Sequence, residues 1–310
     1  MLRNEVTPIP AVLRRAFTEA RILVAIPALN EGPTIGSVVL KARQFASEVV
    51  VIDDGSSDDT AETAALAGAH VIRHARNLGK GMAIRSAWLY AREKDHEALI
   101  LLDGDHQHDP TDIPRLLEPI LSGKADVALG VRWGKTSGMP AYRRVGKRVL
   151  DYVTAAIVKN SAVTDSQCGF RGFSRRALEE LEPTENGLVI ESQMLVEALE
   201  RRLRITEINV KARYDVEGST YPPSRHGLEV LGGLVNLVSE RRPLFFFGIS
   251  GFVITVGAGL LGIYTVQLYR NEGVFAVGYA LLVIFLGLTG LLAMFTGIVL
   301  NSIKKMTRPL

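Results

Sequence analysis

Leu101-Leu102-Asp103-Gly104-Asp105-His106-Gln107 is the end of an apolar strand followed directly by two carboxylates spaced by one residue. Side chains alternate along a strand, so this spacing points Asp103 and Asp105 toward the same side. Hard oxygen ligands at a strand end suit Mg²⁺ or Mn²⁺, and Gln107 adds a neutral oxygen two residues further on. Asp-x-Asp alone also fits an ordinary acidic turn, so the metal interpretation depends on the segments around it.

Outward from this strand, apolar runs of strand length alternate with helical stretches. The expected strands are residues 22–26, 49–52, 70–73, 98–102 and 127–129, and the expected helices are 34–46, 60–67 and 81–92. Such alternation is typical of an α/β domain whose sheet is mostly parallel. Ligands of these sheets collect at the carboxyl ends of the strands.

Two further polar loops follow predicted strands, at residues 27–31 and 53–60. Carboxylates at such positions can accept hydrogen bonds from a nucleobase or a ribose, and Gly55 allows a sharp turn. Asp58 to Thr60 are better explained as caps of the next helix. Lys80 lies between two glycines at a helix start, which suits a diphosphate.

A basic segment follows the last predicted strand. Its cations are Arg132, Arg143, Arg144, Lys147 and Arg148. They are more numerous than an α/β core needs, and arginine forks pair well with phosphate oxygens. The same charges also fit a solvated basic face or a patch attracted to anionic lipid headgroups. No aromatic-interleaved basic module accompanies the net charge of +3, so we expect no nucleic-acid partner.

The chain becomes strongly apolar after Arg241-Arg242-Pro243. Residues 244–268 and 274–303 are each long enough to cross a bilayer, and Tyr269 to Gly273 between them has turn chemistry. We expect a two-helix transmembrane hairpin. Cationic residues flank both outer ends, which places these ends and the preceding domain in the cytoplasm, at the cell membrane. Glycines in the first span would permit close packing, including a homo-oligomer.

These patterns divide the chain into four parts. They are an N-terminal extension (1–21), an α/β domain (22–227), an interfacial or linker helix (228–243) and the hairpin (244–310). The extension is charged and has no uninterrupted apolar run, so it does not resemble a secretory signal. The single cysteine, Cys168, excludes an intramolecular disulfide and a multi-cysteine zinc site.

Taken together, these segments resemble family 2 glycosyltransferases with the GT-A fold, and more closely the dolichyl-phosphate mannose synthase branch. The resemblance implies that Asp103, Asp105 and Gln107 hold the metal on a nucleotide-diphosphate sugar. It implies a donor site made of Pro27, Leu29, Asn30, Glu31, Ile52, Asp54, Lys80, Asp103, Gly104, Asp105, Arg132, Arg213 and Arg225. It also implies that the acceptor phosphate contacts Arg143, Arg144 and Lys147. Residues 165–170 are similar to an Asp-x-x-Ser-Gly-Phe turn of the branch, with Cys168 in place of serine.

The activity that the resemblance implies is inverting, metal-dependent transfer of a hexose to dolichyl or polyprenyl phosphate. GDP-mannose, UDP-glucose and UDP-N-acetylglucosamine are the donors it leaves open. The residues it implies for catalysis are Asp103, Asp105 and Arg132. A phosphate monoester is largely ionised near neutral pH and needs no strong general base. Glu191 lies where many relatives place such a base, and it could instead position the acceptor or supply charge at a helix start.

Three alternatives stay open, of which the first is also a glycosyltransferase. One is a glycosyltransferase that acts on a sugar hydroxyl or a lipid-linked saccharide, although the Gln-x-x-Arg-Trp segment of processive synthases is absent. Another is a nucleotidyltransferase, for which the basic segment and the hairpin make less sense. The last is a non-catalytic membrane scaffold, against which the intact Asp103, Asp105 and Gln107 argue.

Overall fold

The structure, a computed structural model, describes residues 20–132, 168–185, 187–211, 239, 242–273 and 276–307. The chain divides into two compact units, one that ends at Gly232 and one that begins at Gly233. Most of the predicted N-terminal extension and of the predicted linker helix lies outside the described residues. The predicted division into four parts therefore stays a prediction.

The first unit is built on a sheet with the strand order β3-β2-β1-β4-β6-β5-β7. Its strands are β1 (Ile22–Ala28), β2 (Glu48–Asp53), β3 (His70–Arg73), β4 (Ala98–Leu101), β5 (Val127–Arg132), β6 (Arg171–Ser174) and β7 (Ile205–Val210). β6 is antiparallel to β4 and β5, and the other pairs are parallel. The expectation of a mostly parallel α/β sheet is confirmed, while β6 and β7 were not predicted.

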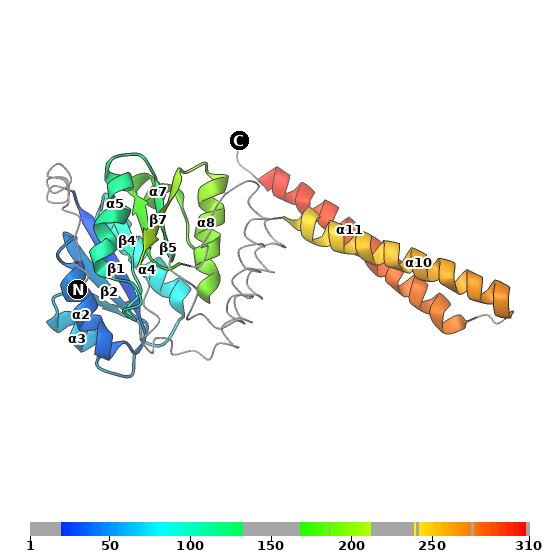
Figure 1. Ribbon diagram of the computed structural model, residues 1–310, viewed down its shortest axis with the longest axis horizontal. Coiled ribbons are helices and arrows are strands. Elements are labelled where there is room, and N and C mark those ends of the chain that lie inside the picture. The colour runs from blue at the N-terminus through cyan, green and yellow to red at the C-terminus, as the bar shows by residue number, and fades with distance from the viewer. Residues whose placement is uncertain are drawn as a thin grey trace, which may run out of the picture. The chain divides into compact units, whose positions relative to one another are not determined.

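Helices cover both faces of this sheet (Figure 1). One face carries α2 (Gly32–Ala42), α3 (Thr60–Leu66) and α5 (Ile113–Leu121), and the other carries α4 (Lys80–Glu93), α7 (Arg175–Glu180) and α8 (Ile190–Glu200). Short 3₁₀ turns, η1 (Pro110–Asp112) and η3 (Gly187–Val189), precede α5 and α8. α2 begins two residues before the predicted helix 34–46 and ends at Ala42, four residues short of it.

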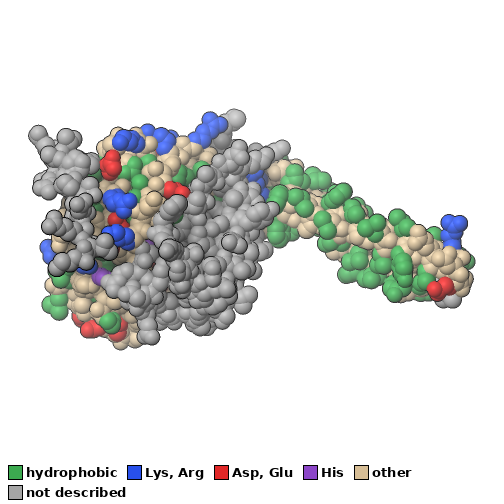
Figure 2. Space-filling view, in the orientation of Figure 1, with side chains coloured by type: hydrophobic (Ala, Val, Ile, Leu, Met, Phe, Trp, Pro, Cys, Tyr) green, Lys and Arg blue, Asp and Glu red, His purple; other side chains and the backbone are tan. Residues whose placement is uncertain are grey.

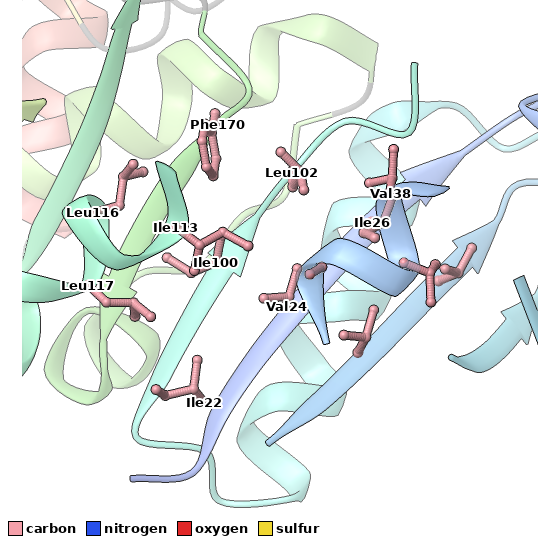
Figure 3. Close-up of a cluster of buried hydrophobic side chains, with 14 of the residues drawn as sticks. Ile22, Val24, Ile26, Val38, Ile100, Leu102, Ile113, Leu116, Leu117 and Phe170 are labelled. Carbon is pink, nitrogen blue, oxygen red and sulfur yellow. The ribbon is translucent and has the colours of Figure 1, made fainter. Parts of the chain in front are cut away.

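Alternation along β1 fills two separate cores, because successive side chains point to opposite faces. Ile22, Val24 and Ile26 pack with α2 and α5, as Figure 3 shows, while Leu23 and Ala25 face α4 and α8. All five side chains are fully buried. The central strand is thus locked in register, since a slip by one residue would exchange its two faces.

The strand order reverses beside β1. From β1 the chain adds β2 and then β3 on one side, and it later places β4 on the other side. In an open α/β sheet, such a reversal opens a crevice at the carboxyl ends of the two strands concerned. The loops after β1 and β4 are therefore the positions where a ligand is expected.

Helix capping in this unit differs in one detail from the expectation. Asp58 accepts a hydrogen bond from the Thr60 amide at 3.1 Å, so it caps α3. It also accepts from the Gly32 amide at 3.0 Å, and so supports the start of α2. Asp59, which the sequence offered as a cap, makes no side-chain cap hydrogen bond. One carboxylate therefore serves two helix starts.

In the described part of the second unit, two long helices follow each other. A π-helical turn, η4 (Leu244–Gly248), leads into α10 (Ile249–Glu272), and α11 (Val277–Thr307) follows. Both helices are long and apolar enough to cross a membrane, by length and composition. Apolar side chains cover their surface, as Figure 2 shows. This agrees with the predicted two-helix hairpin.

The predicted turn over Tyr269 to Gly273 was wrong in its position. α10 continues through Arg270 to Glu272, and the chain leaves the helix at Gly273, whose φ of +70° is left-handed. Arg270 is in the last helical turn, where a cation interacts favourably with the helix dipole. The polar residues therefore end the apolar run but not the helix, and the helix ends at Gly273.

Glycines bring the two long helices together. A Cβ added to Gly251 would lie 2.6 Å from the Gly290 carbonyl oxygen, and one added to Gly290 would lie 2.7 Å from the Gly251 carbonyl oxygen. The hairpin therefore uses Gly251 for its own packing. A Cβ on Gly257 or Gly259 would meet nothing within 4 Å. The predicted homo-oligomer stays a prediction.

Trp88 on α4 provides a test of how the first unit is held together. It is 2% exposed, its Nε1 donates to the Leu178 carbonyl at 3.2 Å, and its ring packs edge-on against Phe173 at 4.9 Å. Trp88→Ala should cost about 3–5 kcal/mol of unfolding free energy. Leu89→Ala, one residue on and 56% exposed, should change it by less than about 0.5 kcal/mol. Thermal unfolding followed by circular dichroism compares the two; equal losses would contradict the packing described.

Candidate active site

The loop after β4 meets the loop after β1 at the reversal point. Thr34 Oγ1, in the first turn of α2, donates to the Gly104 carbonyl at 2.8 Å and lies 3.2 Å from Glu31 Oε2. A Cβ added to Gly104 would lie 3.5 Å from Glu31 Cγ. Asp105 Oδ1 accepts from the Gln107 amide at 3.0 Å. The segment that holds the two aspartates is thus fixed directly against Glu31.

Crowded carboxylates dominate the electrostatics of this edge. Burial, followed by the charge of Asp105, raises the pKa of Glu31 to about 7. Burial, followed by the charge of Asp103, raises the pKa of Asp105 to about 6. Each shift has the sign expected when a carboxylate is partly removed from water beside a like charge. The site therefore carries negative charge that a cationic ligand would stabilise.

Lys80, the first residue of α4, lies between two of the carboxylates. Its Nζ is 2.8 Å from Asp103 Oδ1 and 2.9 Å from Glu191 Oε1. Burial lowers the pKa of Lys80, but the two carboxylates raise it by more, so it stands above its ordinary value. The ammonium stays charged, and it joins the loop after β4 to the first turn of α8.

Backbone contacts continue this connection beneath the site. A Cβ added to Gly169 would lie 2.3 Å from Asp103 Oδ2, so the chain passes directly against that carboxylate. Arg171, only 1% exposed, donates from Nε to the Cys168 carbonyl at 2.7 Å and from Nη1 to the Glu191 carbonyl at 2.6 Å. Asp103, Lys80, Glu191, Arg171 and the Cys168–Gly169 backbone form a closed ring of contacts. We call it the carboxylate ring.

A second set of contacts joins the loops after β1 and β2. The Asn30 amide donates to Ser56 Oγ at 2.9 Å, and Asn30 Oδ1 accepts from the Ser57 amide at 2.9 Å. Asn30 has a left-handed φ of +55°, which asparagine tolerates better than most residues. The two strand ends are therefore held as one surface beside the aspartates.

Asp54 anchors the loop that leads into α4. Its carboxylate accepts from the Leu78 amide at 3.0 Å and from the Gly79 amide at 2.7 Å. It also lies 2.6 Å from His74 Nδ1, whose Nε2 is 2.9 Å from Ser86 Oγ. A Cβ added to Gly55 would be 2.5 Å from the Arg76 carbonyl carbon, so this turn and this loop touch. The expected sharp turn at Gly55 is confirmed by its φ of +78°.

The structure brings most of the predicted donor residues to one edge. Lys80 begins α4, and Pro27 is half-buried at the end of β1. The loops after β1, β2 and β4 hold the others, which are Leu29, Asn30, Glu31, Asp54, Gly104 and both aspartates. Ile52 is fully buried in the core against α4. Arg132 ends β5, and its side chain is not described. Arg143, Arg144, Lys147, Arg213 and Arg225 lie outside the described residues.

Comparison with known proteins is consistent with this geometry. The family model for glycosyl transferase family 2 matches residues 23–182. The chain belongs to glycosyltransferase family 2. It is 32% identical to glycosyltransferase AglJ of Haloferax volcanii, over 78% of this chain and 80% of that protein. The resemblance inferred from the sequence is thereby confirmed, and the chain is a glycosyltransferase.

Two further matches concern ligands. The chain is 28% identical to a UDP-N-acetylglucosamine–dolichyl-phosphate N-acetylglucosaminyltransferase of Methanococcus voltae, over 62% of this chain and 86% of that protein. Among solved structures, it is similar to glucosyl-3-phosphoglycerate synthase of Mycobacterium tuberculosis in complex with Mn²⁺, UDP-glucose and phosphoglyceric acid. That match has a TM-score of 0.59 and 26% identity, and covers 72% of this chain and 81% of that one. The GT-A fold is therefore confirmed.

Glu31, Asp103 and Asp105 lie together at one edge of the sheet, which we call the carboxylate edge. The residues at this edge fit a divalent metal. Among the described residues, no group of three or more His, Cys, Asp or Glu side chains is placed to hold an ion unaided. A donor diphosphate would thus have to complete the shell, as is usual for Mg²⁺. Burial first, and repulsion by neighbouring carboxylates second, raise the pKa of Glu31 and of Asp105, and a bound cation would counteract both effects. Asp103, Asp105 and Gln107 are the residues that would hold the ion.

Several residues of this site were not found from the sequence. Thr34, His74 and Arg171 act through contacts with segments distant in the chain, and none of them belongs to a short motif. One feature of the sequence points to Arg171, because it is a charged residue within an otherwise apolar segment. A cation in such a position is rare unless its donors are all used.

Gly169→Ala tests whether the carboxylate ring holds Asp103 in place. The added Cβ must displace the Asp103 carboxylate, so Mn²⁺ affinity should fall roughly 10- to 100-fold. Gly172→Ala is the control, because its Cβ would meet Ile120 Cδ1 at 2.7 Å and Ile100 Cδ1 at 3.0 Å, away from the aspartates. It should cost about 1–3 kcal/mol of stability but leave Mn²⁺ affinity unchanged. Electron paramagnetic resonance of free Mn²⁺ measures both; equal affinities in the two variants would contradict this role.

Proposed function

We propose that this enzyme transfers a hexose from a nucleotide-diphosphate sugar to a polyprenyl or dolichyl phosphate at the cytoplasmic face of the cell membrane, with inversion at the anomeric carbon. The observation that carries the proposal is the cluster of Glu31, Asp103 and Asp105 at the reversal point of the sheet, with Lys80 in contact with Asp103. This edge suits a metal-bound diphosphate. The relative that acts on dolichyl phosphate and the two apolar helices support a lipid acceptor.

The donor would occupy the surface formed by the loops after β1, β2 and β4. Asn30 and the loop that Asp54 anchors would hold the nucleoside, and Lys80 would contact the diphosphate. A divalent metal, Mg²⁺ or Mn²⁺, would supply charge neutralisation for the departing nucleoside diphosphate when bound at Asp103, Asp105 and Gln107. Arg132 would add to this neutralisation. The chain thus assembles the leaving-group side of the reaction.

The acceptor side would rely on charge rather than on proton removal. The phosphate of the lipid, held by Arg143, Arg144 and Lys147, would attack the anomeric carbon from the opposite face. A phosphate monoester is already largely ionised near neutral pH, because its second pKa is about 6. No general base is then required. The burial of Glu191 and its pairing with Lys80 agree with this, since neither favours a base that must reach the acceptor.

Transfer to the lipid is the direct test. Purified full-length protein in detergent is incubated with Mn²⁺, dolichyl phosphate and, in turn, radiolabelled GDP-mannose, UDP-glucose and UDP-N-acetylglucosamine. One of them should label the lipid, and Asp105→Asn should reduce labelling about 100-fold or more. Asp109→Asn is the matched control, because the Asp109 carboxylate caps η1 at the Thr111 amide and asparagine can do the same.

Two other results would contradict the proposal. If no donor labels the lipid while nucleotide-sugar hydrolysis persists, the acceptor is a sugar hydroxyl or a lipid-linked saccharide. If Mn²⁺-dependent hydrolysis of all three donors is also absent, the proposed donor chemistry is wrong.

A further inference from the structure

The Lys80 ammonium contacts two carboxylates, which is more than a diphosphate contact alone requires. A lysine that only bound phosphate oxygens would need no buried carboxylate behind it. Glu191 is 3% exposed, and its Oε1 is 2.9 Å from Lys80 Nζ. Its other oxygen, Oε2, is buried without a hydrogen-bond partner among the described residues. A buried carboxylate is costly unless it is paired, so Glu191 and Lys80 depend on each other.

We propose that Lys80 is an internal counter-cation of Asp103 that gives way to the divalent metal, and that Glu191 is the positioning residue that keeps Lys80 at the site after this exchange. The inference rests on the proposed function, because it assumes a metal-bound donor diphosphate. It concerns residues whose ion pairs are described: Lys80 with Asp103 at 2.8 Å and Lys80 with Glu191 at 2.9 Å.

Competition for Asp103 follows from electrostatics. Lys80 takes Asp103 Oδ1, and the Gly169 backbone is packed against Oδ2, so the carboxylate has little room to turn. An ammonium and a divalent cation on one carboxylate repel each other. Metal without nucleotide must therefore displace Lys80 from Asp103, and its binding is weakened.

A bound diphosphate reverses this balance. Its negatively charged oxygens can pair with the Lys80 ammonium, so the ammonium leaves Asp103 for another anionic partner. Metal and nucleotide then strengthen each other's binding, which is a reciprocal coupling between two ligands. Glu191 stays paired with Lys80 throughout, and its place in the first turn of α8 is fixed by the Arg171 bond to its carbonyl. The empty enzyme is thereby biased against holding metal alone.

The first test measures Mn²⁺ binding without nucleotide, by electron paramagnetic resonance of the free ion, on full-length protein in detergent. Lys80→Met keeps the apolar stem and removes the ammonium, so Mn²⁺ affinity should rise roughly tenfold. Affinity for GDP or UDP at saturating Mn²⁺ should instead fall roughly tenfold. Lys80→Arg keeps the cation and should retain the weak Mn²⁺ binding. Lys94→Met, at the other end of α4, should change neither affinity.

The second test separates positioning from base catalysis. Glu191→Gln should raise the KM for the donor and weaken Mn²⁺-dependent nucleotide binding, with a smaller change in kcat. A general base would show the opposite split, with kcat lost and nucleotide affinity kept. Glu200→Gln, at the C-terminal end of α8, controls for the loss of a charge on this helix.

The outcomes distinguish this inference from the proposed function. If Lys80→Met leaves Mn²⁺ affinity unchanged or lowers it, while the wild type still binds nucleotide with Mn²⁺, the counter-cation role is wrong and the proposed function stands. If Glu191→Gln loses only kcat, Glu191 is a base and its positioning role is wrong. If the wild type binds neither GDP nor UDP with Mn²⁺, the proposed function fails and this inference fails with it.

Discussion

The ammonium of Lys80, held between Asp103 and Glu191, is the interaction on which the rest of the site depends. Glu31, Asp103, Asp105 and Glu191 meet at one edge of the sheet, and such a concentration of carboxylates is unstable without a cation. Lys80 is the cation that the described residues place among them. It also joins α4, the loop after β4 and α8, which are far apart in the sequence. The same charge that stabilises the fold is available to a diphosphate.

The topology determines why this cluster forms where it does. β1 and β4 are parallel neighbours whose carboxyl ends reach the same edge, so the polar loops that follow two largely buried strands meet there. The antiparallel strand β6 then runs back from the same edge, so that Gly169 and Arg171 at its start lie beneath Asp103 and Glu191. Backbone carbonyls accept hydrogen bonds from the buried Arg171 guanidinium, so this charged side chain can link two segments inside the fold. The edge that carries the crowded carboxylates is thus built by the sheet itself.

Much of the fold could be predicted from local sequence patterns. The strands up to β5, the turn at Gly55, the start of α4 to within one residue and the two apolar helices all follow from periodicity and glycine placement. Contacts between distant segments were not predictable. Three features depend on tertiary packing and cannot be inferred from the spacing of residues in the sequence. They are the pairing of Lys80 with Glu191, the role of Arg171 and the insertion of β6 between β4 and β5. The turn at Tyr269 was misplaced because polar residues in a strong helix do not end it, whereas Gly273 does.

The central claim is that the carboxylate edge binds a nucleoside diphosphate through a divalent metal. Calorimetric titration of GDP and UDP into the full-length protein, once with Mn²⁺ and once with EDTA, tests it most directly. The account predicts that one of the two nucleotides binds in Mn²⁺ and that this binding is lost in EDTA, because the crowded carboxylates repel an unaccompanied diphosphate. Equal affinity in EDTA would contradict the account, since the aspartates would then contribute nothing to donor binding.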